Sequence, residues 1–239
     1  DPMKEPKRPV LAHGKVRHVG DAYAAVIAET EQQARDAAEK INADIKELPA
    51  VIDMASALSG KNFVHDEIGT NQCYDWGWIE DNREATDKAI KNAHHVTTLE
   101  LVNNRLVPNA MEPRCSIADY NPANDDYTLY TTSQNPHLTR LLISAFVLGI
   151  PENKLTVVSP DVGGGFGSKI YHYGEEALVL AAAKRIKRPV RWTATRSESF
   201  MSDAHGRDHV TKIELALDKD NNFLAFRTET MANVGAYCL

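Results

Sequence analysis

Glycine residues gather at one point of the chain in a pattern that suits a bound anion. Four of the 13 glycines fall within five residues, at Gly163, Gly164, Gly165 and Gly167, with Phe166 among them. Consecutive glycines let backbone N–H groups turn toward one point and let a ligand approach the main chain closely. The spacing matches neither a P-loop nor the GxGxxG pattern. The stretch predicts a loop that binds an oxyanion, a phosphate or a metal-bound oxygen, with a purely structural turn as the alternative.

Two polar features precede this loop. Gln134 ends an expected strand just before Asn135-Pro136, and a polar side chain at such a junction often points into a cleft. An ordinary surface glutamine is the alternative. The segment Met111-Glu112-Pro113-Arg114 places opposite charges around a proline, for which the alternative is a rigid bend with a solvated ion pair.

Cysteine and histidine spacings give no metal site. Cys73, Cys115 and Cys238 are odd in number and widely spaced, which supports neither a disulfide framework nor a zinc or iron–sulfur site. His205 and His209 stand four residues apart, but Gly206 between them disfavours a helix that would bring them together. Reduced thiols favour the cytoplasm, and the periplasm stays open.

Composition excludes several classes of protein. The chain has 239 residues, a net charge of −6, 43% hydrophobic and 25% charged residues, which is typical of a globular protein with a sizeable core. Its negative charge argues against a nucleic-acid partner. Its apolar runs are shorter than the roughly 20 residues of a membrane-spanning helix. Its abrupt ends lead us to expect a piece of a longer protein.

The elements before the loop fall into two groups. In the first, residues 22–28 and 45–49 are apolar and predict strands, and between them Thr30 and Gln33 predict a helix with a capping box. Residues 59–82 are polar, contain three glycines, and predict a linker.

Residues 83–239 predict pairs of strands with helices between them. Strands are expected at 96–102, 115–120, 127–132, 155–158, 190–194, 210–217 and 223–231. Helices are expected at 85–92, from Pro136 to Gly149, and at 175–187. The second helix should bury Leu138, Leu141, Leu142, Ala145 and Phe146. Such an order favours an α+β fold over a doubly wound parallel sheet.

Four motifs in a fixed order resemble one protein family. They are Asn103-Asn104-Arg105-Leu106-Val107-Pro108, Met111-Glu112-Pro113-Arg114, Thr132-Ser133-Gln134-Asn135-Pro136-His137, and Val162-Gly163-Gly164-Gly165-Phe166-Gly167-Ser168-Lys169. Together they resemble the molybdopterin-binding large subunit of the xanthine dehydrogenase and aldehyde oxidase family, including aerobic carbon monoxide dehydrogenase large chains. The resemblance implies the C-terminal part of an α/β hammerhead-like domain at 1–58, a linker at 59–82, and the N-terminal part of a mixed α+β molybdopterin-binding domain, truncated, at 83–239.

The resemblance also implies site residues. Gln134 matches a catalytic glutamine whose side-chain amide lies beside an oxo ligand of molybdenum, and Phe166 matches a second contact to the metal's ligands. The cofactor-binding loop would comprise Gly164, Gly165, Phe166 and Gly167. Ile170 stands where purine-oxidising relatives have Glu, so a purine substrate is not expected. The family's catalytic glutamate would lie beyond Leu239, so we expect this chain alone to be inactive, and Cys238 to be structural.

The implied enzyme is a molybdenum-dependent hydroxylase or dehydrogenase. It would oxidise an aldehyde or aromatic heterocycle, or act like carbon monoxide dehydrogenase, with oxygen from water. Its cofactor would be molybdenum-molybdopterin in the cytosine dinucleotide form, and its partners an Fe–S small subunit and an FAD medium subunit in a dimer of heterotrimers. Two alternatives remain: a phosphate- or nucleotide-binding module that uses residues 163–167, and a noncatalytic interaction subunit.

Overall fold

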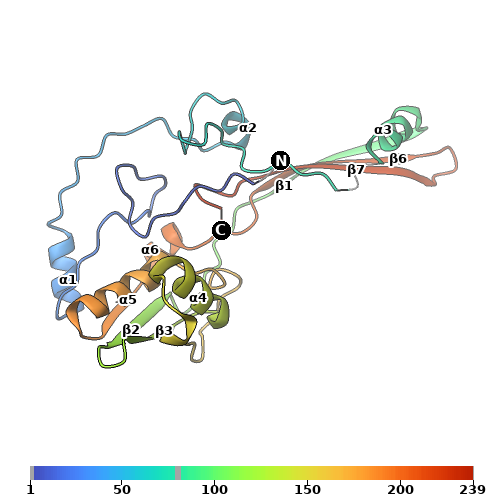
Figure 1. Cartoon of the computed structure of the whole chain (residues 1–239). Coiled ribbons are helices and arrows are strands. Elements are labelled where there is room, and N and C mark those ends of the chain that lie inside the picture. The colour runs from blue at the N-terminus through green and yellow to red at the C-terminus, as the bar shows by residue number, and fades with distance from the viewer. Residues whose placement is uncertain (1–2, 79–81, 239) are drawn as a thin grey trace. The chain divides into compact units, whose positions relative to one another are not determined.

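The computed structural model describes residues 3–78 and 82–238, and Figure 1 shows the helices and strands. They form two compact units, of which the first comprises Asp1–Lys7, Leu48–Leu106 and Gly206–Cys238. The second comprises Arg8–Glu47 and Val107–His205. Both units mix helices with strands, which confirms the expected α+β class. Among the described residues, no helix has the length and apolar character needed to cross a membrane.

The first unit is built on a three-stranded antiparallel sheet in the order β1-β6-β7. Its strands are β1 (His95–Asn103), β6 (His209–Leu217) and β7 (Phe223–Ala232). Helix α3 (Arg83–Asn92) covers one face, where Arg227 of β7 forms ion pairs with Asp87 of α3 and Glu214 of β6. The short helix α2 (Met54–Ala57) belongs to the same unit.

The opposite face of this sheet carries apolar side chains interspersed with threonines. Successive residues of a strand point to opposite faces, so Phe226 lies on the side away from Arg227. Leu99 pairs with Ile213, and Leu215 pairs with Phe226. Leu99 and Phe226 are 51% and 61% exposed. Among the described residues this face therefore contributes little to a core.

The second unit contains a mixed four-stranded sheet in the order β4-β3-β2-β5. The predicted hairpin is confirmed as β2 (Cys115–Asn121) and β3 (Asp126–Thr131). Strand β5 (Val190–Thr193) pairs with β2 in antiparallel fashion, and β4 (Leu155–Val158) pairs with β3 in parallel. Helix α5 (Gly174–Ile186) packs on β2, β3 and β5 (Figure 1).

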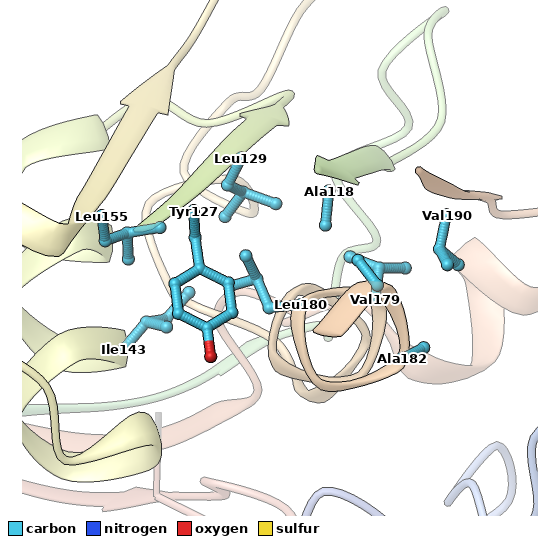
Figure 2. Close-up of a cluster of buried hydrophobic side chains, with 10 residues drawn as sticks. Ala118, Tyr127, Leu129, Ile143, Leu155, Val179, Leu180, Ala182 and Val190 are labelled. Carbon is cyan, nitrogen blue, oxygen red and sulfur yellow. The ribbon is translucent and has the colours of Figure 1, made fainter. Parts of the chain in front are cut away.

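The hydrophobic core lies between this sheet and its helices. Figure 2 shows Leu129 of β3, Leu155 of β4 and Leu180 of α5 converging on one cluster. Its full membership is Ala118, Tyr127, Leu129, Ile143, Leu155, Val179, Leu180, Ala182, Ala183 and Val190. Because all of these belong to the second unit, the site-bearing loops rest on the better packed part of the chain.

The predicted buried stripe after Pro136 is wrong. Helix α4 (Pro136–Leu142) begins with Pro at its first turn and continues as the π-helical segment η2 (Ile143–Leu148), which ends at Gly149. The buried residues are Thr139, Ile143 and Ser144, whereas Leu138, Leu141 and Phe146 are exposed. A π-helical segment departs from the 3.6-residue period on which the predicted stripe depends.

The predicted strands at 22–28 and 45–49 are also wrong. Both segments lack strand structure, because no described strand pairs with them. The helix between them is confirmed as α1 (Glu31–Ala38), with Thr30 and Gln33 forming the expected capping box. Three short helices among the described residues escaped prediction: α2, α6 (Arg196–Ser202) and the 3-10 turn η3 (Glu152–Lys154).

Candidate functional site

Gln134 occupies the connection between β3 and α4, and its side chain is held in one orientation. Its Oε1 accepts hydrogen bonds from the N–H of Gly167, at 3.0 Å, and of Lys169, at 3.2 Å. Its own N–H donates to the carbonyl of Lys169, at 2.8 Å. Because both partners of the side-chain oxygen are donors, the amide cannot be reversed without losing both bonds. Its Nε2 therefore points away from them, and no described residue accepts a hydrogen bond from it.

The glycine loop lies directly against this glutamine. A Cβ at Gly165 would lie 2.2 Å from Gln134 Oε1, and one at Gly163 would lie 2.6 Å from Glu112 Cβ. At those two positions glycine is required for close approach. Gly167 has φ of +95°, a conformation that other L-residues adopt only at a cost. Each of these glycines is thus required for a steric reason. The loop contacts both Gln134 and the Met111–Arg114 region.

Two backbone donors in the loop lack an acceptor among the described residues. They are the N–H groups of Gly165 and Phe166, whereas the N–H of Gly163 donates to Glu112 Oε2 and that of Gly164 donates to the carbonyl of Val162. Phe166 has φ of +51° and is 75% exposed. With Gln134 Nε2, the site offers three unused donors, which suits an oxygen-rich anionic ligand.

Glu112 and Lys169 form an ion pair that anchors the glycine loop. Lys169 follows the loop, and its side chain is only 1% exposed. Its Nζ donates to the Glu112 carbonyl at 2.8 Å and to Glu112 Oε2 at 3.2 Å. The alternative interpretation, a solvated ion pair between Glu112 and Arg114, is wrong, because the structure gives each of these side chains other partners. Lys169 was missed because lysine is seldom fully buried, and its place just after the glycines was the available signal.

Arg114 forms a buried ion cluster next to this region. Its guanidinium donates to Asp203 at 2.6 Å and to both oxygens of Glu175 at 3.2 and 3.3 Å. It also lies 3.7 Å from the centroid of the Tyr173 ring, a cation–π contact. Burial alone would lower the pKa of Arg114, but the Glu175 and Asp203 carboxylates raise it. Burial raises and Arg114 lowers the pKa of Glu175, with a net lowering, so the cluster stays charged.

Arg196 fixes the other side of the segment that carries Glu112. Its guanidinium donates to Asn109 Oδ1 at 2.6 Å, to the Ala110 carbonyl at 2.7 Å and to the Met111 carbonyl at 2.8 Å. Arg196 is the first residue of α6. Because it lies far along the chain from the residues it holds, no local sequence pattern pointed to it.

The cysteines carry no sign of nucleophilic chemistry. Burial, followed by the neighbouring Cys73 thiol, raises the pKa of Cys238 to about 11. Burial also raises the pKa of Cys115. Both therefore stay protonated near neutral pH. Within residues 3–78 and 82–238, no three His, Cys, Asp or Glu side chains are grouped so that they could hold a metal ion.

Two family matches cover most of the chain. Residues 64–239 match the molybdopterin cofactor-binding domain, and residues 2–49 match the a/b hammerhead domain of aldehyde oxidase and xanthine dehydrogenase. The candidate site lies entirely within the first of these ranges.

Curated relatives and solved structures give the same picture. The chain is 31% identical to the nicotine 6-hydroxylase large subunit of Paenarthrobacter nicotinovorans, over 96% of this chain and 28% of that protein. It is 34% identical to the carbon monoxide dehydrogenase large chain of Hydrogenophaga pseudoflava, over 95% and 30%. It superimposes on quinoline 2-oxidoreductase from Pseudomonas putida 86 with a TM-score of 0.89 and 31% identity, over 98% of this chain and 29% of that one. The chain thus spans less than a third of each relative's length.

Proposed function

Because this chain belongs to the aldehyde oxidase and xanthine dehydrogenase family of molybdopterin-binding proteins, we propose that it forms part of the cofactor site of a molybdenum-dependent oxidoreductase. When bound, the cofactor would supply a two-electron oxidation in which a substrate C–H becomes C–OH with oxygen from water, releasing two electrons and two protons. The family matches favour this function over the phosphate- or nucleotide-binding module and the noncatalytic subunit.

The fixed amide of Gln134 is the observation that carries the proposal. Two backbone N–H groups hold Oε1, so Nε2 is left as a neutral donor beside the loop. The N–H groups of Gly165 and Phe166 add two donors without described acceptors. This donor set fits a cofactor whose metal carries oxygen ligands and whose pterin carries a phosphate. Glycine at positions 165 and 163 lets Gln134 and Glu112 pack directly against the loop, which holds these donors in place.

Each residue of the site would have a distinct role. Gln134 would donate from Nε2 toward the cofactor's oxygen ligands, which gain negative charge on reduction, and would therefore favour the reduced state. Gly165 and Phe166 would donate backbone hydrogen bonds, and the Phe166 side chain would border the metal's ligands. Gly164 and Gly167 would give the loop the positive φ angles, +97° and +95°, that shape it.

For the substrate, we propose an aldehyde or an aromatic heterocycle. The names of the nicotine hydroxylase and the quinoline oxidoreductase support the heterocycle. The carbon monoxide dehydrogenase large chain supports the alternative of carbon monoxide. Ile170 is 40% exposed at the end of the loop, and its apolar side chain offers no carboxylate to a purine.

The wider assembly is proposed on the same basis. The cofactor would be the cytosine dinucleotide form, and electrons would pass to an Fe–S small subunit and an FAD medium subunit in a dimer of heterotrimers in the cytoplasm. Relatives named as large subunits or as a subunit of a dehydrogenase complex support partner subunits. A hammerhead-like part at 1–58, a linker at 59–82 and a molybdopterin-binding part from residue 83 remain our proposal. The gap between the matched ranges supports a boundary near residue 58.

Replacing Gln134 with Ala tests the proposal. We expect the full product of the gene that encodes this chain, co-expressed with its partner subunits, to copurify with molybdenum and pterin. In that enzyme Gln134→Ala should slow reduction of the metal by substrate roughly 10-fold or more, which corresponds to about 1.4 kcal/mol of lost stabilisation. Stopped-flow spectroscopy under anaerobic conditions measures the rate.

Gln32→Ala is the matched control. Gln32 lies on α1, and among the described residues its side chain bonds only to Asp36 one turn away, so its removal should leave the reduction rate unchanged. A folded complex that contains no molybdenum would refute the proposal. Equal reduction rates for Gln134→Ala and Gln32→Ala would refute the role of Gln134.

A further inference from the structure

Lys169 connects the glycine loop to both of its neighbours. Its backbone N–H and carbonyl bond to Gln134, at 3.2 and 2.8 Å. Its buried ammonium bonds to the carbonyl and a carboxylate oxygen of Glu112, at 2.8 and 3.2 Å. A displacement of this one residue therefore alters the anchoring of Gln134 and of Glu112 together.

Glu112 in turn brackets the first residue of the loop. Its Oε2 accepts a hydrogen bond from the Gly163 N–H at 2.7 Å, and its own N–H donates to the Gly163 carbonyl at 3.2 Å. The two backbones meet so closely that a Cβ at Gly163 would lie 2.6 Å from Glu112 Cβ. The loop is thus fixed at its start by Glu112 and at its end by Lys169, which are bonded to each other.

The backbone that leads into Glu112 is held by a third side chain. Arg196 holds the Ala110 and Met111 carbonyls, which directly precede Glu112. The backbone that leads into Glu112 is therefore held by Arg196, while the Glu112 carboxylate is bonded to Lys169 and Gly163. A buried cation against a fixed acceptor gains charge-assisted hydrogen bonds, which are stronger and shorter than neutral ones.

We propose that Glu112 and Lys169 are a positioning pair that orders residues 163–167 and, through them, sets the direction of the Gln134 amide. The ordering of the loop follows from the contacts within this chain. Its consequence for the cofactor rests on the proposed function, because only a bound cofactor gives the direction of Gln134 Nε2 a chemical effect.

Hydrogen exchange tests the ordering directly. In the complete complex, backbone amide exchange of residues 163–169 is compared among wild type, Lys169→Met, Glu112→Gln, the double variant, and Lys184→Met. Lys169→Met leaves the Glu112 carboxylate without its cation, and Glu112→Gln leaves a buried ammonium without its counter-charge. We expect each single change to speed loop exchange at least 10-fold, while amides of β3 stay unchanged.

The double variant and the control separate positioning from general damage. Removing both charges leaves a neutral pair of similar shape, so the double variant should recover at least part of the loop protection that either single variant loses. Lys184 pairs with Asp125 at the surface, with both side chains about half-exposed, so Lys184→Met should behave as wild type. If Lys169→Met does not fold, Glu112→Gln and the double variant carry the test.

A second measurement links the loop to the site. In the metal-loaded enzyme, Lys169→Met should lower the rate of metal reduction at least 10-fold with little change in KM, and Lys184→Met should not. Loop exchange unchanged in both single variants would overturn the proposal, even if Gln134→Ala slows reduction. Faster loop exchange in the single variants, in a complex that holds no molybdenum even as wild type, would instead uphold the pair and refute the proposed function.

Discussion

At the scale of single residues, Gly165 leaves no space for a side chain beside Gln134. A Cβ there would lie 2.2 Å from Oε1 and 2.5 Å from Cδ of Gln134. Such a clash forces the glutamine side chain to leave its two backbone donors, each of which contributes about 1 kcal/mol. A substitution at Gly165 is thus a second way to displace the Gln134 amide without changing the chemistry of that side chain.

Gly165→Ala should therefore reproduce much of the Gln134→Ala defect. We expect metal reduction to slow by about 10-fold or more, with the protein still folded, since one displaced side chain near the surface costs little global stability. Reduction kinetics and circular dichroism measure the two properties. Gly206→Ala is the control, because a Cβ there meets no atom within 4 Å. Normal kinetics in Gly165→Ala would contradict the described packing.

The sequence predicted the prominent residues of this region and missed their supports. Gln134 and the glycines were singled out because a polar junction residue and a glycine cluster are unusual, and the structure does bring them together. Lys169 and Arg196 were missed because their importance depends on burial and on partners distant in the chain. A lysine or arginine in a sequence carries no mark of whether it faces solvent or a backbone carbonyl.

At the scale of elements, the start of α5 holds a buried acid. Thr131 Oγ1 donates to Glu176 Oε1 at 2.7 Å, and the Tyr173 N–H donates to Oε2 at 3.0 Å. Burial raises the pKa of Glu176 above its ordinary 4.5, although these hydrogen bonds oppose the shift. The folded state therefore binds the proton more tightly than the unfolded state. The resulting stabilisation is complete below pH 4.5 and is lost as the pH rises through the folded-state pKa.

Glu176→Gln should remove this pH dependence. A glutamine can still accept from the Tyr173 N–H and pair with Thr131, and it never ionises, so the variant should gain on wild type as the pH rises. We expect the free energy of unfolding of the variant to rise relative to that of wild type between pH 5 and pH 8. Urea denaturation at both pH values measures the difference. The control Glu152→Gln, at an exposed position, should show no gain in stability over wild type as the pH rises. If the stability of Glu176→Gln changes with pH in parallel with that of wild type, the raised pKa of Glu176 is contradicted.

Elements were predictable where local signals set them. The capping box of α1 and the turn between β2 and β3 are local, and both were correct. The strands expected at 22–28 and 45–49 were not, because a strand requires a partner that its own residues do not encode. The buried face after Pro136 was wrong because α4 passes into the π-helical η2, whose period an ordinary helical pattern does not contain.

At the scale of the whole molecule, the two units differ in how much they bury. All ten residues of the hydrophobic cluster lie in the second unit. In the described part of the first unit, the buried residues are few: Ala216, His65 and Tyr237. Local stability follows buried apolar contacts, so the two sheets should open independently and at different free energies.

Hydrogen exchange should distinguish β3 from β6, which are inner strands of the two sheets. We expect amides of β3 to be protected at least 10-fold more strongly than amides of β6, although each strand has hydrogen-bonded neighbours on both sides. Exchange followed by mass spectrometry of peptides from each strand measures the ratio. The turns after Asn121 and Leu217 serve as fast-exchanging references in both units. Equal protection of β3 and β6 would show that the first unit gains stability from contacts other than those described.

The order β1-β6-β7 has a practical consequence for handling this protein. Within the described residues, β1 and β7 each present an outer edge of unpaired N–H and C=O groups. Such edges are templates for strand addition between molecules, which charged residues counteract. Strand β7 carries Arg227 and Glu229, but its first residues, Phe223 and Leu224, are apolar and exposed. Aggregation of a concentrated preparation should therefore begin at the start of β7, and a lysine in place of Phe223 is the first change to make for solubility.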